Sequence, residues 1–331
     1  MKTASRLLAA ILASAIFGSA TAALAETPAK LLFSAERNPA PGAARSIGFY
    51  SNGCLAGGAE LPPDGPHWQA MRLSRNRNYG HPDTVAVIER IAGEAARAGV
   101  WPGLLVGDVS QPRGGPMASG HASHQVGLDF DVWLQPMPSP RLSAEQRETY
   151  PFRSVLKNGT FTVDDRIWNP RYRDLIEIAA SQAEVERIFV HPGIKKKLCE
   201  TAGRDRGWLA KVRPYYGHHE HFHVRLSCRP GSSGCKPQPA IGAGDGCNEL
   251  DWWFNVALQP PKPGGKPAKP KPPLTLAGMP KACSAVLGAP DVGGSAVAAG
   301  GSSSGMQAPS YASAFAPPAS SVPIPTPRPF R

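Results

Sequence analysis

Two stretches of the chain repeat apolar residues at the spacing of an amphipathic helix. The segment HPDTVAVIERIAGEAARAG, residues 81–99, places apolar side chains every three or four positions and stops at Gly99. In NPRYRDLIEIAASQAEV, residues 169–185, Asn169 precedes a proline that suits the first helical position. The pattern predicts two helices, one ending near Gly99 and one beginning at Pro170.

Other stretches have the apolar pattern of strands. They are short and bounded by turn-forming residues. They comprise residues 103–108, 126–134, 187–190 and 221–227. Because helices and strands are interspersed with many turns and no internal repeat is visible, the chain predicts an α+β fold in a single domain.

The alternation is strict in VGLDFDVWL, residues 126–134. Asp129, Asp131 and Trp133 share one face of this predicted strand, and five apolar residues share the other. Neighbouring carboxylates on one face repel each other, so they need a cation, a hydrogen-bond network or open water. Taken alone, the pair fits an edge strand with solvated acids as well as it fits a metal site.

Six of the nine histidines gather in two short segments. They are His121, His124, His218, His219, His221 and His223. These histidines could bind a metal, or they could be core histidines with a structural role. A solvated polar face is rarely built from histidine, however, whereas zinc sites usually contain it, so the two segments together favour a metal site.

The segment HEHFH, residues 219–223, matches the letters of the H-E-x-x-H zinc motif. That motif works on a helix, where its two histidines share a face. Here a proline and a glycine precede it, and HFHVRLS alternates with the period of a strand. On a strand, His221 and His223 face the same side and Glu220 points away. The informative pattern is therefore His-x-His.

The first 25 residues resemble a secretory signal. Lys2 and Arg6 precede a short apolar run, and Ala-Leu-Ala at 23–25 predicts cleavage after Ala25. The run is too short to indicate a membrane span. We therefore expect an exported mature protein without a membrane span.

The C-terminal region has the composition of a disordered tail. Residues 260–331 hold 16 of the 36 prolines. The stretch around Cys283 interrupts this composition and predicts a return to the folded body. We therefore expect a signal peptide at 1–25, one folded domain at 26–290 and a disordered tail rich in proline, alanine and serine at 291–331.

The net charge of +11 is mostly a property of the ends of the chain. From Gln259 onward seven lysines or arginines face a single acid, and two more basic residues lie in the signal segment. The body is only weakly basic. This argues against nucleic acid as a partner, because no basic face is visible in the folded part.

Six cysteines in an exported chain suggest disulfides. Two of them flank the flexible RPGSSG loop, and two others lie near the ends of the ordered region. Among the fifteen possible connectivities, we predict the pairs Cys228–Cys235, Cys54–Cys283 and Cys199–Cys247.

The spacing His124-x6-Asp131, followed by His221-x-His223, resembles the LAS-type zinc peptidases, which are named for lysostaphin, D-Ala-D-Ala metallopeptidases and sonic hedgehog. The strings RNRNYGHP, SGHASHQVGLDFDVW and GWLAKVRPYYGHHEHFHVRLSC resemble one branch, the penicillin-insensitive murein endopeptidases. The resemblance covers roughly residues 40–285. It implies an LAS-type domain with a central antiparallel sheet and long disulfide-tied loops.

The resemblance also implies roles for individual residues. His124, Asp131 and His223 would bind Zn2+, which leaves a fourth coordination position open as a catalytic zinc requires. His221 would be the catalytic histidine. Three further residues would orient ligands or meet the substrate, namely His121, His218 and Asp129.

The implied reaction is hydrolysis of the amide between D-alanine and meso-diaminopimelate in peptidoglycan, in the periplasm, by a metal-activated water. Penicillin would not inhibit it, because β-lactams acylate a serine nucleophile. A serine enzyme is the weaker interpretation: Ser154 to Lys157 spell S-x-x-K, but no convincing K-T-G or S-D-N partner motif is present.

Two other functions remain open from the sequence. One is a D,D-carboxypeptidase or dipeptidase of the same fold. The other is a non-catalytic module that binds the cell wall, although an intact ligand set together with His221 argues against it.

Overall fold

The computed structural model describes residues 26–260 and 271–291. The predicted signal peptide and all but Asp291 of the predicted tail lie outside them, so both segments and the boundary at residue 290 stay predictions. No helix in the described part of the chain is long and apolar enough to cross a membrane. The helices are α1 (Ala29–Ala35), α2 (Pro82–Arg97), α3 (Ala144–Thr149), α4 (Pro170–Ser181), α5 (Pro192–Thr201), α6 (Leu250–Trp252) and α7 (Ala282–Leu287).

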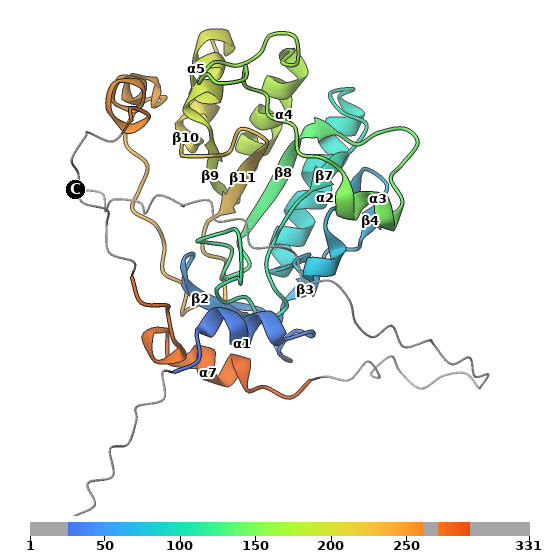
Figure 1. The fold of residues 1–331 in the computed structure, drawn as a ribbon, viewed down its shortest axis with the longest axis vertical. Helices are drawn as coiled ribbons and strands as arrows, with labels where there is room; N and C mark the ends of the chain where they lie inside the picture. Colours follow the sequence, from blue (N-terminus) through green and yellow to red (C-terminus); the bar gives the residue numbers. More distant parts are fainter. Residues whose placement is uncertain (1–25, 261–270, 292–331) are drawn as a thin grey trace, which may run out of the picture. The chain divides into compact units, whose positions relative to one another are not determined.

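The strands form one large sheet and two small ones (Figure 1). The large sheet has the order β10-β9-β11-β8-β7-β5-β4. The strands are β1 (Arg45–Phe49), β2 (Asn52–Ala56), β3 (Ala59–Glu60), β4 (Asp64–Gly65), β5 (Trp68–Ala70), β6 (Tyr79–Gly80), β7 (Leu104–Val106), β8 (Asp129–Pro136), β9 (Val185–Val190), β10 (Val212–Pro214) and β11 (His221–Leu226). This arrangement confirms the α+β class.

The expected antiparallel sheet is found in the middle of the large sheet, where β9, β11, β8 and β7 pair antiparallel. The sheet as a whole is mixed, because β5 pairs parallel with β7 and β9 pairs parallel with β10. Parallel neighbours need a crossover connection, and α2 and α5 supply the two crossovers.

Both predicted helices are present, and each has a side-chain cap. Asn169 accepts from the Arg171 N–H at the start of α4, and His81 accepts from the Asp83 N–H at the start of α2. Gly99 follows α2 with φ +65°, a left-handed conformation that ends a helix at little cost.

The strand predicted at 126–134 begins three residues late, at Asp129. Gly127 has φ +70°, and a Cβ there would lie 2.6 Å from the Leu55 side chain. The turn at Gly127 interrupts the extended backbone before β8 begins, and it brings the preceding histidines toward the strand.

The two faces of β8 have different environments, as the alternation predicts. Phe130, Val132 and Leu134 are fully buried in the main core with the apolar sides of α2 and α4. Trp133 belongs to a separate cluster. The face that carries Asp129 and Asp131 is therefore free to form a polar site.

All three predicted disulfides are present, namely Cys54–Cys283, Cys199–Cys247 and Cys228–Cys235. The first joins residues 229 positions apart and ties α7 to β2, beside α1 at the lower edge of Figure 1. The third closes a loop of only 7 positions.

These loop lengths predict unequal stabilisation. Replacing Cys54 and Cys283 together by serine should lower the free energy of unfolding by about 5 kcal/mol, because chain entropy lost from the unfolded state grows with loop length. The matched control, Cys228→Ser with Cys235→Ser, should cost about 2.5 kcal/mol. Denaturant unfolding of both variants checks the order, and equal losses would contradict it.

Candidate metal centre

The site is built by the register between β8 and β11. Three residues of each strand lie directly opposite one another on the polar face of the sheet. The pairs are Asp129 with Arg225, Asp131 with His223, and Trp133 with His221. A shift of one residue would turn one of the two sets away from the other.

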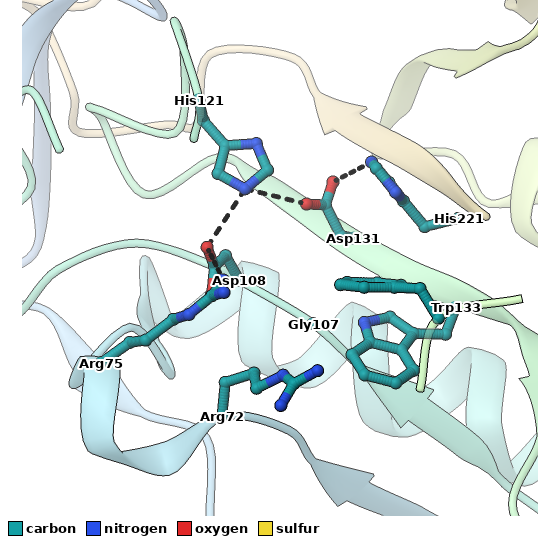
Figure 2. A pocket seen from close by; sticks show the side chains of 9 residues that line it. Arg72, Arg75, Gly107, Asp108, His121, Asp131, Trp133 and His221 are labelled. Atoms are coloured by element: carbon teal, nitrogen blue, oxygen red, sulfur yellow. Dashed lines mark hydrogen bonds and ion pairs between the residues drawn. The ribbon is translucent and has the colours of Figure 1, made fainter. Parts of the chain in front are cut away.

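Asp131 lies at the centre of the histidines. Its Oδ1 is 3.5 Å from His124 Nε2 and 3.3 Å from His223 Nδ1, and its Oδ2 is 3.4 Å from His121 Nε2. Figure 2 shows Asp131 between His121 and His221. Burial alone would raise the pKa of Asp131, but the charges of the surrounding histidines hold this pKa well below its usual value.

His124 is held by the backbone around it. It has φ +67°, its N–H donates to Asp129 Oδ2 at 2.9 Å, and its Nδ1 donates to the Val109 carbonyl at 2.7 Å. Since Nδ1 donates to the backbone, Nε2 is the nitrogen that faces Asp131. Burial lowers the pKa of His124, but the Asp131 carboxylate outweighs burial and raises it to about 9.

His223 is oriented from behind by a buried ion pair. Its Nε2 lies 3.0 Å from Asp129 Oδ1, although not in line for a hydrogen bond. Asp129 also accepts from Arg225 Nε at 2.6 Å, and the Arg225 guanidinium lies 4.1 Å from the Tyr50 ring centroid. Asp129 is fully buried, which suits the orienting role expected of it and keeps it from contact with a substrate.

The donor atoms at this site fit a metal ion. His124 Nε2 and Asp131 Oδ1 are buried and have no hydrogen-bond partner. In tetrahedral zinc sites with bonds of 2.0–2.1 Å, neighbouring ligand atoms lie about 3.4 Å apart. The separations of Asp131 Oδ1 from His124 Nε2 and His223 Nδ1 match this spacing.

A second possible set replaces His223 by His121. Ligand atoms of His121, His124 and Asp131 all lie within 4.8 Å of one another. In this arrangement, however, His121 Nε2 also lies 3.1 Å from Asp108 Oδ2, so this nitrogen acts as a donor to a carboxylate. The two sets share His124 and Asp131.

His221 lies at the open side of the cluster, with Nε2 3.7 Å from Asp131 Oδ1. Burial lowers its pKa to about 4, against the raising effect of Asp131, so the imidazole is neutral at neutral pH. His221 belongs to a small pocket with an empty volume of about 280 Å3 (Figure 2). The other residues that line it are Arg72, Arg75, Gly107, Asp108, His121, Asp131, Trp133 and Phe152.

The structure places His218 at the edge of the same cluster. It has φ +52°, its Nδ1 lies 2.7 Å from the Tyr216 carbonyl oxygen, and its ring centroid is 5.0 Å from that of His221. His219 turns elsewhere, with Nδ1 3.0 Å from Ser154 Oγ. The strand at 221–226 confirms that the H-E-x-x-H letters do not lie on a helix.

Sequence reasoning missed two residues that support the site. Asp108 forms ion pairs with His121, Arg77 and Arg75. Burial would raise the pKa of Asp108, but these three partners hold it below its usual value. Arg225 was detectable, because the period of two that aligns His221 and His223 places it on the same face. Asp108 was harder to detect, because the sequence marks it only as the polar residue at the end of the short predicted strand 103–108.

Comparison with known proteins points to one family. A family model described as "Penicillin-insensitive murein endopeptidase" matches residues 46–288. A protein of that name from Haemophilus influenzae is 47% identical over 234 residues, which cover 70% of this chain and 79% of the relative. Proteins of the same name from Escherichia coli and Shigella flexneri are 43% and 42% identical, and each alignment covers 86% of this chain and 97% of the relative.

The contacts of Asp129 predict a role in metal affinity. Asp129→Asn should weaken zinc binding about 10- to 100-fold, because it removes the charge that fixes the His223 ring. Competition with a chromophoric chelator measures the affinity, and circular dichroism checks the fold. Asp251→Asn, at an exposed acid, is the matched control and should leave the affinity unchanged. Equal affinity in all three proteins would rule out the orienting role.

Proposed function

The chain belongs to the penicillin-insensitive murein endopeptidase family, and we propose that it hydrolyses peptide cross-links of peptidoglycan at a zinc ion held by His124, Asp131 and His223. The observation that carries this proposal is the buried Asp131 Oδ1, which has no hydrogen-bond partner and faces one nitrogen of each of the two histidines. A divalent cation would satisfy all three atoms together.

The choice of His223 over His121 as the third ligand rests on the partners of each ring. His223 Nε2 lies on the side of the Asp129 carboxylate, so its Nδ1 is the nitrogen that faces Asp131 and is available to a metal. His121 uses Nε2 toward Asp108. We therefore assign His121, with His218, to the substrate side of the site.

His221 is the proposed catalytic base. A bound zinc ion would supply Lewis acidity, which lowers the pKa of a water molecule and polarises the amide carbonyl. The neutral His221 imidazole can accept the proton of the attacking water and return it to the leaving amine. No serine lines this pocket, which agrees with a reaction that β-lactams do not block.

The finer properties of the enzyme follow from the same proposal. The bond cut would be the D-alanyl–meso-diaminopimelyl amide, and the protein would act in the periplasm after cleavage of its signal peptide behind Ala25. Three disulfides suit an oxidising compartment. A D,D-carboxypeptidase would instead release terminal D-alanine, and a binding module would release no product.

Two variants separate the proposed roles. His223→Ala should lose both zinc and hydrolysis, whereas His221→Ala should keep zinc and lose about 10^2- to 10^4-fold in kcat, as expected for a general base. Zinc content by mass spectrometry and the masses of products from cross-linked murein measure the two properties. If His221→Ala still hydrolyses at the wild-type rate, the base is another residue.

His121→Ala tests the ligand assignment directly. It should retain zinc with an affinity close to that of the wild type, because it lies outside the proposed ligand set. Loss of zinc from this variant, with zinc retained in His223→Ala, would transfer the third ligand to His121. In the wild type, a chelator should stop product release and added zinc should restore it. Penicillin should not change the rate of product release.

A further inference from the structure

A second cleft beside the proposed active site has no assigned role. With an empty volume of about 1230 Å3, it is much larger than the pocket around His221. We name it the donor cleft and define it by Ser154, Lys157, Phe161, His191, His219 and Leu258, which line it. We propose that it binds a free carboxylate on a peptide stem of the murein substrate, away from the bond that is cut. This inference rests on the function proposed above.

Two chain segments connect the donor cleft with the pocket of the active site. Phe152 and His221 line the active-site pocket, and Ser154 and His219, each two residues away, line the donor cleft. Two residues of chain span at most about 7 Å. One peptide stem could therefore reach from one site to the other.

Hydrogen bonds fix the tautomer of one histidine of the donor cleft and hold the other in place. Ser154 Oγ accepts from the Leu156 N–H at 3.1 Å and lies 3.0 Å from His219 Nδ1. His191 Nδ1 accepts from the Gly193 N–H at 3.0 Å. The neutral His191 ring then carries its proton on Nε2, where it can donate to a ligand.

The charge in the cleft is also suited to an anion. Lys157 is exposed and lacks an ion-pair partner within the described ranges, since Asp164 binds Arg166 and Asp165 binds Lys197. None of the residues that line the cleft is acidic. A carboxylate would meet the Lys157 ammonium and the His191 N–H together, and the stem peptides of murein carry free carboxylates.

A kinetic comparison tests the proposal on the zinc-loaded protein. The substrates are a cross-linked muropeptide dimer with free stem carboxylates and the same dimer with these carboxylates amidated. Lys157→Gln should raise the KM for the free-carboxylate dimer about two- to fivefold and leave its kcat unchanged, because an exposed charge contact contributes to binding alone. The variant should have little effect on the amidated dimer. Lys30→Gln, at an exposed lysine of α1, should match the wild type on both dimers.

Three results would overturn the proposal. Lys157→Gln could leave KM unchanged, or it could change KM equally for both dimers. Alternatively, Ser154→Ala could abolish kcat, which would make the Ser154–His219 pair part of the chemistry rather than of binding.

If the wild type cuts neither dimer, the proposed function is wrong, but the proposal for the donor cleft is still open to a test. Calorimetric binding of both dimers to the wild type and to Lys157→Gln then tests the cleft by itself. Tighter binding of the free-carboxylate dimer that disappears in Lys157→Gln supports the proposal, and equal binding in all four combinations contradicts it.

Discussion

The buried carboxylate of Asp131 is the constraint on which the rest of the site depends. A charge removed from water must be compensated, and three imidazole nitrogens approach Oδ1 of this residue within 3.7 Å. Asp131 Oδ1 has no hydrogen-bond partner, so a cation bound in the proposed site would compensate its charge. Leaving such a group uncompensated is costly, and the geometry of its neighbours therefore matters.

A buried ion pair fixes the geometry of two of these neighbours. Arg225 binds Asp129 through two hydrogen bonds and lies between the rings of Tyr50 and Phe189. Such a pair contributes little net stability, because desolvation of both charges offsets their attraction. Its benefit is geometric: Asp129 holds the backbone of His124 and faces the ring of His223, which positions two proposed ligands from one carboxylate.

Backbone strain is concentrated around the same centre. Among the described residues, four other than glycine have a positive φ, and three of them, Arg72, His124 and His218, contribute to the pocket or the histidine cluster. Left-handed conformations of such residues persist only where neighbouring contacts enforce them. Arg72 donates to the Tyr150 carbonyl oxygen, His124 donates to Asp129 and to the Val109 carbonyl oxygen, and His218 Nδ1 lies 2.7 Å from the Tyr216 carbonyl oxygen. These contacts provide that support.

The sequence by itself determined the local features: two helices, the face of each strand on which the acids and histidines lie, the residue types of the candidate metal site and a disulfide pairing. These depend on short-range periodicity and spacing. Only the tertiary structure decided that Asp131 lies opposite His223, that β8 begins at Asp129, and that Arg225 and Asp108 complete the polar network. A period of two assigns a residue to a face but does not name its partner, because register and ring orientation depend on contacts between segments some ninety residues apart.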